Sequence, residues 1–168
     1  SEKNQETLRR MVAEGHTIGI HTYTHDYGSI YASIEAYLED FNRTFERIHA
    51  ITGTYPTVFR FPGGSINGYT RTFYQPLIAE LGRRGFVYFD WNVSSEDAAG
   101  AETVAAITAN TVAGVGDCYR AVVLFHDSGT KWATAEALPG ILTELGRQGF
   151  QFAPLTAEVR PVVFNYED

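Results

Sequence analysis

Two histidines, His21 and His25, stand four residues apart at the end of a short apolar run. Within that run Ile18 and Ile20 alternate with a threonine and a glycine, which is typical of a buried strand and too short for a helix. Neutral imidazoles are common zinc ligands, and the three residues between the histidines suit a tight loop. The spacing therefore predicts that both rings meet one divalent cation, although pairs of this kind also arise by chance.

Other residues suited to catalysis follow other strand-like runs. Arg60 ends one run, Asp90 and Trp91 end a second, and His126 with Asp127 ends a third. Each has an ordinary structural role open to it: a carbonyl cap, a turn residue, an aromatic at the rim, and a histidine held by its neighbour. Because parallel strands share one carboxyl-end face, where α/β enzymes place their sites, we expect these residues and the histidine pair to converge.

Helices that end in glycine connect these strands. A helix over 5–14 ends at Gly15, and a longer one begins after Ser33 as N-cap and stops at Gly53. The phrase at 77–86, LIAELGRRGF, recurs at 141–150 as ILTELGRQGF, with a weaker copy at 11–16. Such repetition of helix, glycine and strand predicts parallel strands with helices outside, in an α/β barrel or doubly wound sheet. The expected strands lie near 17–20, 57–61, 86–90, 121–125 and 150–153.

The composition suits one compact domain over residues 1–168, with 44% hydrophobic and 20% charged residues. A net charge of −7 excludes the basic surface that nucleic acid requires and favours a neutral ligand. No run reaches the length of a membrane span, so we expect no membrane insertion. The single cysteine, Cys118, cannot form an internal disulfide.

Four motifs, in this order, resemble motifs two to five of the polysaccharide deacetylases, the NodB-like, family-four carbohydrate esterases. They are HTYTH at 21–25, RFPG at 60–63, DWNV at 90–93 and LFHD at 124–127. The residues of these motifs are similar to those of bacterial peptidoglycan N-acetylglucosamine deacetylases. The resemblance implies a distorted (β/α) barrel, an acetylated glycan as substrate, a cell-surface or extracellular location, and a divalent metal, commonly zinc, with cobalt or manganese as alternatives.

The resemblance also implies a role for each matching residue. His21 and His25 would bind the metal, and His126 would be the general acid that protonates the leaving amine. Asp90 would orient His126, and Arg60 would orient the catalytic base.

The substrate-binding residues come from the same motifs. The loop at Gly63, where the family usually has tyrosine, would offer a backbone N–H to the oxyanion. Trp91 and Leu124 would form a small apolar pocket for the acetyl methyl group.

The family's first motif, Thr-Phe-Asp-Asp, is not found in this sequence. That motif supplies the catalytic base and a third metal ligand, so we expect the chain to be a fragment without about 50 upstream residues. An incomplete barrel would expose strand edges that favour association. Two alternatives stay open: an inactive glycan-binding relative, and an α/β domain whose strand-end residues serve stability without a metal.

Overall fold

The computed structural model describes residues 1–116 and 118–165. The chain separates into two compact units, one formed by residues 1–90 with the C-terminal segment from Pro154, and the other by Trp91–Ala153. The division of the chain into one or more domains stays a prediction. No helix within the described ranges is long and apolar enough to cross a membrane.

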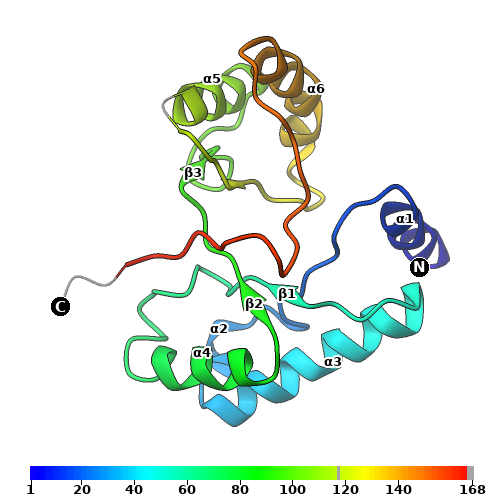
Figure 1. Cartoon of the computed structure of the whole chain (residues 1–168), viewed down its shortest axis with the longest axis vertical. Coiled ribbons are helices and arrows are strands. Elements are labelled where there is room, and N and C mark those ends of the chain that lie inside the picture. Colours follow the sequence, from blue (N-terminus) through cyan, green and yellow to red (C-terminus); the bar gives the residue numbers. More distant parts are fainter. Residues whose placement is uncertain (117, 166–168) are drawn as a thin grey trace. The chain divides into compact units, whose positions relative to one another are not determined.

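The first unit combines four helices with parallel strand pairing (Figure 1). The strands β1 (Val58–Phe59) and β2 (Val87–Tyr88) pair in parallel, and Ile20 bridges to Phe59, also in parallel. The predicted strand at 17–20 is thus reduced to one bridging residue, but the predicted parallel arrangement is confirmed here. The helices are α1 (Glu2–Ala13), α2 (Tyr27–Ile30), α3 (Ile34–Thr52) and α4 (Tyr74–Arg83).

Both predicted ends of α3 are confirmed. The Ser33 side chain accepts a hydrogen bond from the Ala36 N–H at 3.1 Å, as an N-cap does. Gly53 ends the helix with a φ of 73°, a left-handed conformation that glycine adopts without steric cost.

The three copies of the repeated phrase end in the same way. Each has a glycine in the left-handed region, and the next residue donates its N–H to a carbonyl five positions back, as in a Schellman motif. The glycines are Gly15, Gly85 and Gly149, with φ of 87°, 88° and 92°. The donors are His16, Phe86 and Phe150, at 3.0, 3.0 and 3.1 Å. The helix–glycine repeat is therefore confirmed, whereas residues 150–153 do not form the predicted strand.

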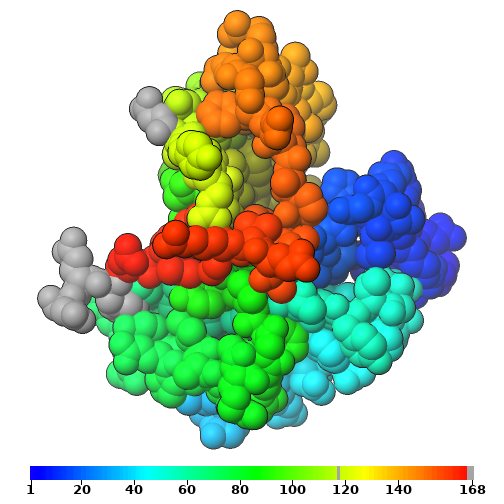
Figure 2. Space-filling view, in the orientation of Figure 1, coloured from blue at the N-terminus to red at the C-terminus, as the bar shows by residue number. Residues whose placement is uncertain are grey.

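The core of the first unit is rich in aromatic rings. Tyr37 and Phe41 of α3 and Leu81 of α4 are almost fully buried, together with Phe59 and Phe61 from the β1 region. The space-filling view shows side chains of α3, in cyan, and of α4, in green, at the surface of this unit (Figure 2). This packing anchors α3. Side chains of α3 in turn hold the loop between the two histidines.

The second unit pairs two further parallel strands under two helices (Figure 1). Its elements are β3 (Val93–Ser94), α5 (Val104–Gly116), β4 (Val123–Leu124) and α6 (Trp132–Arg147). Helix α5 approaches β3 so closely that a Cβ on Gly114 would lie 2.7 Å from a methyl of Val93. The strand β3 was not predicted, because its two residues follow the Asp90–Trp91 pair that was assigned to a strand end.

Candidate active site

The structure brings the imidazoles of His21 and His25 together. Their ring centroids lie 5.1 Å apart, and both side chains are exposed. The ring of His21 forms a hydrogen bond of 2.8 Å from Nδ1 to the carbonyl oxygen of Arg60. Because a carbonyl only accepts, Nδ1 carries the proton and Nε2 keeps a lone pair, the tautomer that a metal-binding histidine needs.

The strand pairing explains this arrangement. Ile20 donates its N–H to Val58, and Arg60 donates its N–H to the carbonyl of Ile20, each at 3.0 Å. His21 therefore leaves the bridge beside the end of β1, where the Arg60 carbonyl lies. The donor set fits a divalent cation as two neutral imidazoles, and the role of the pair as ligands stays a prediction. Across residues 1–116 and 118–165, no cluster of three or more His, Cys, Asp or Glu side chains could hold a metal.

Arg60 is half-buried, and the two residues that follow β2 hold its side chain. Its guanidinium donates to the carbonyls of Phe89 and Asp90 at 3.0 and 3.2 Å. Burial lowers the pKa of Arg60, and the charge of Asp90 partly opposes this shift. The predicted role of Arg60, to orient a catalytic base, stays a prediction.

The loop after Pro62 has a defined shape. Gly63 and Gly64 have φ of 76° and 83°, in the left-handed region. The carbonyl of Pro62 accepts from the Tyr31 hydroxyl at 2.7 Å and from the Asn67 amide at 3.2 Å. Gly63 therefore lies in a turn that these hydrogen bonds fix.

A neighbouring ring occupies the space beside Gly63. A Cβ added at Gly63 would lie 3.0 Å from the Tyr27 hydroxyl oxygen. Tyr27 also lies 5.4 Å, between ring centroids, from both His25 and Tyr69. An aromatic side chain from α2 thus lies next to both the glycine and the histidine pair.

Asp90 does not act as predicted. It is fully buried, and its carboxylate accepts from the N–H and hydroxyl of Ser65 at 2.8 and 2.6 Å and from the Phe164 N–H at 2.8 Å. Asp90 therefore fixes the glycine-rich loop and the C-terminal segment of its own unit. The orienting partner of His126 is a different residue, Asp97.

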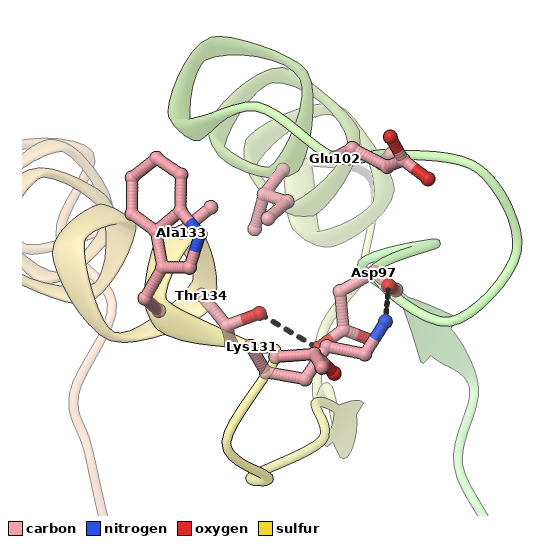
Figure 3. Close-up of a pocket in the computed structure, with 9 residues that line it drawn as sticks. Asp97, Glu102, Lys131, Ala133 and Thr134 are labelled. Carbon is pink, nitrogen blue, oxygen red and sulfur yellow. Dashed lines mark hydrogen bonds between the residues drawn. The ribbon is translucent and has the colours of Figure 1, made fainter.

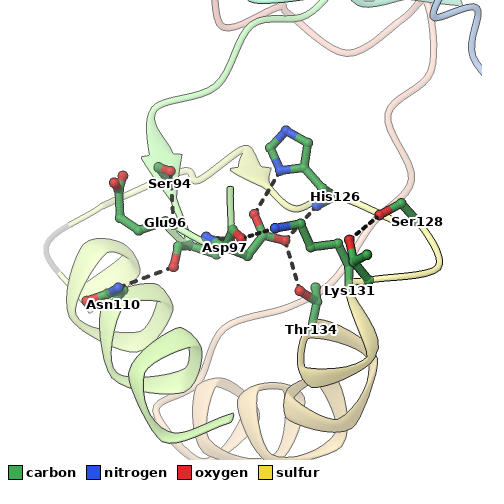
Figure 4. A network of polar contacts seen from close by, with 10 residues as sticks. Ser94, Glu96, Asp97, Asn110, His126, Ser128, Lys131 and Thr134 are labelled. Atoms are coloured by element: carbon green, nitrogen blue, oxygen red, sulfur yellow. Dashed lines mark hydrogen bonds and ion pairs between the residues drawn. The ribbon is translucent and has the colours of Figure 1, made fainter. Parts of the chain in front are cut away.

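Figure 4 shows this pairing within the second unit. His126 bonds to Asp97 twice, from its ring Nδ1 to Oδ1 and from its backbone N–H to Oδ2, each at 2.8 Å. Thr134 donates its hydroxyl to Oδ2 at 2.9 Å, and Lys131 donates to the Asp97 carbonyl. The Asp97 side chain is 1% exposed and that of His126 is 42% exposed. A buried carboxylate thus holds an accessible imidazole.

The hydrogen bonds to Asp97 also set its charge. Burial alone would raise the pKa of Asp97, but bonds from His126, Thr134 and Ser95 outweigh it and lower the pKa below its usual range. The carboxylate is therefore ionised at neutral pH. With its Nδ1–H directed at Asp97, His126 exposes Nε2 as the reactive nitrogen.

Sequence reasoning missed Asp97 because the strand before it, β3, has two residues, too few to be recognised from the sequence. The parallel register pairs Ser94 with Leu124, which places Asp97, three residues past β3, opposite His126, two residues past β4. The signal available was an acidic residue three positions after a Val-Ser pair. Trp91 and Leu124 are both half-buried in this unit, and their predicted acetyl pocket stays a prediction.

A cavity of about 410 Å³ lies beside the same network (Figure 3). Its lining includes the side chains of Asp97, Glu102, Lys131, Trp132 and Thr134. Its apolar lining comes from Ala101, Ile107 and Ala133, and Thr130 completes it. Asp97 therefore lies between its polar network and a cavity of the second unit.

Comparison with known proteins identifies the family. The family model for polysaccharide deacetylase matches residues 1–81. A peptidoglycan-N-acetylglucosamine deacetylase of Bacillus cereus is 30% identical over 166 residues, which cover 95% of this chain and 70% of that protein. The catalytic domain of a peptidoglycan N-acetylglucosamine deacetylase from Eubacterium rectale superposes with a TM-score of 0.91 at 30% identity, over 99% of this chain and 77% of that one.

The chain belongs to the polysaccharide deacetylase family, a family of hydrolases. The predicted fold class, α/β of the NodB-like type, is confirmed by these structural neighbours. The chain spans 55% of the length of its Bacillus subtilis relative YheN, at 28% identity over 94% of this chain. A Bacillus anthracis protein described as a CE4 family pseudoenzyme shares the fold, with a TM-score of 0.71 over 89% of this chain and 48% of that one, at 21% identity.

Proposed function

We propose that this chain provides much of a metal-dependent deacetylase domain that hydrolyses N-acetyl groups of peptidoglycan or a chitin-like N-acetylglucosamine polymer. The observation that carries the proposal is the His21–His25 pair, with centroids 5.1 Å apart and one Nε2 fixed as a lone-pair donor by the Arg60 carbonyl. Peptidoglycan is favoured because the named relatives act on it. An extracellular or cell-surface location would follow from that substrate.

His21 and His25 would hold the metal, with zinc as the first choice for two imidazoles. When bound, the metal would polarise the acetamide carbonyl and lower the pKa of a bound water. No group of three or more His, Cys, Asp or Glu side chains that could hold a metal is found among the described residues. A carboxylate of the family's first motif would complete the proposed site.

His126 would be the general acid, with Asp97 as its positioning residue. The Asp97 carboxylate keeps Nδ1 occupied, so that Nε2 would deliver the proton to the leaving amine of the sugar. Gly63 would donate its N–H to the oxyanion, and Trp91 with Leu124 would receive the acetyl methyl.

An inactive, glycan-binding relative is the second candidate. It is favoured by one observation: within the described ranges, no group of three or more His, Cys, Asp or Glu side chains could hold a metal. Such a protein would bind acetylated glycan at the same loops and release no acetate.

The test is acetate release from an acetylated chitooligosaccharide with zinc or cobalt added. Residues 1–168 alone should release almost none, because loss of a general base costs about 10²-fold or more and an under-ligated metal binds weakly. The same chain fused to a first-motif strand, Thr-Phe-Asp-Asp, of a family relative should be active. His126→Ala should abolish that activity, whereas His16→Ala, at an exposed histidine, should not.

The outcomes separate the candidates. Robust turnover by residues 1–168 alone, abolished by His126→Ala, would show that the base lies within the chain and would contradict the need for an outside carboxylate. A fused chain that stays inert, while it still binds the oligosaccharide, would favour the glycan-binding candidate.

A further inference from the structure

The loop that joins the two histidines has an unfavourable backbone. Thr22 and His25 have φ of 66° and 55°, in the left-handed region, although neither is glycine. Residues with a Cβ adopt this region at a cost, and a β-branched threonine more so. A loop with two such residues requires stabilising contacts from outside itself, since such conformations persist only where the surroundings determine them.

Those contacts come from a buried carboxylate on α3. Asp40 is 7% exposed, and both of its oxygens are used. One accepts the Tyr23 N–H, and the other accepts the Thr24 N–H at 3.1 Å and the Thr24 hydroxyl at 2.8 Å. Tyr23 and Thr24 lie between the two left-handed residues, so Asp40 binds the centre of the loop.

A second residue of α3 reaches the same loop. The guanidinium carbon of Arg43 lies 4.1 Å above the ring of Tyr23, at a distance typical of a cation–π contact. Arg43 is three positions after Asp40, so the two side chains share one face of the helix. That helix is the one anchored in the aromatic core through Tyr37 and Phe41.

We propose that Asp40 is a positioning residue for the metal pair. By binding the amides of Tyr23 and Thr24 it holds the loop in the conformation that places the His25 ring beside the His21 ring. The inference rests on the proposed metal-binding function of the pair, and it assigns to Asp40 a role in affinity for the metal without contact with it. A carboxylate that serves folding alone would affect stability and leave the affinity of the folded protein unchanged.

The first measurement is the zinc affinity of residues 1–168, by competition with a chromophoric chelator. Asp40→Asn should weaken zinc binding about 10- to 100-fold, the range seen when groups that orient a ligand are removed. Thr24→Val, which removes one of the three bonds, should weaken it less. The matched control is Glu39→Gln, which makes the same charge change on the exposed neighbouring position and should stay within twofold of the native chain.

The second measurement is amide hydrogen exchange at Tyr23 and Thr24 without metal. Asp40→Asn should exchange at least tenfold faster there than Glu39→Gln, while amides within α4 stay protected to the same extent. This readout is independent of zinc, so it tests whether Asp40 holds the loop even if the native chain binds no zinc. Absence of zinc binding by the native chain would count against the proposed function instead.

Two results would overturn the inference. One is a folded Asp40→Asn variant with native zinc affinity, and the other is unchanged exchange at both loop amides. Should Asp40→Asn fail to fold, Thr24→Val takes its place, and native affinity together with native exchange in that variant would overturn the inference equally.

Discussion

Asp97 holds the imidazole of the candidate acid, His126, in place. Its carboxylate is buried, ionised and bonded twice to His126. Thr134 donates to the same carboxylate, and Lys131 donates to the backbone carbonyl of Asp97. A charged hydrogen-bond acceptor of this kind contributes more than a neutral one. The contacts that stabilise Asp97 are therefore the same contacts that hold His126, the residue that would transfer the proton.

Asp97→Asn should lower the free energy of unfolding by about 3 kcal/mol at pH 5, since it removes a charged acceptor from a buried network. The folded pKa of Asp97 is depressed, so its contribution is present above the unfolded pKa of about 3.9 and is lost as the pH falls through the folded pKa. The difference between native and variant chains should therefore shrink below about pH 4. Urea unfolding at pH 5 and pH 3 measures it.

Asp127→Asn is the control for this experiment, because Asp127 is an exposed neighbour of His126 and its loss should change stability little. A deficit for Asp97→Asn that is equally large at pH 3 and pH 5 would mean that the ionised carboxylate is not the source of the stabilisation.

The turn at Gly63 is constrained in two ways. It requires a positive φ, and its open side is filled by the ring of Tyr27. Gly53, at the end of α3, has a similar φ of 73° but no atom within 4 Å of an added Cβ. Substitutions at the two glycines therefore distinguish the cost of backbone strain from the cost of steric contact.

Gly53→Ala should cost about 1 kcal/mol of stability, the cost of a left-handed residue with a Cβ. Gly63→Ala should cost about 2 kcal/mol or more, because the added methyl also displaces the Tyr27 ring. Thermal unfolding of both variants compares them directly. Equal losses would show that the Tyr27 ring makes room for the added methyl without cost and would contradict this prediction.

At the level of elements, the features that could be predicted were those determined by the residue type at a single position. The Ser33 cap, the Gly53 stop and the three helix–glycine ends depend on single residues, and the structure has each of them. The strands have two residues each, too few for alternation to be recognised, so β3 was missed and 150–153 was wrongly predicted. The wrong partner for His126 follows from that gap, because Asp97 is placed only by the β3–β4 register.

At the level of the whole chain, the candidate residues divide between two units. His21, His25, Arg60, Gly63 and Asp90 belong to the first, while Trp91, Leu124 and His126 belong to the second. Their convergence on one face stays a prediction, as does association through exposed strand edges. The metal pair, by contrast, lies wholly in the first unit and can be tested alone.

X-ray absorption at the zinc edge of the zinc-loaded chain tests the metal site most directly. We predict two imidazole nitrogens at about 2.0 to 2.1 Å, with the remaining positions filled by oxygen. His21→Ala and His25→Ala should each reduce this to one imidazole, and His16→Ala should leave two. A spectrum without imidazole scattering, or one that neither His21→Ala nor His25→Ala changes, would contradict the assignment of this pair as the metal site.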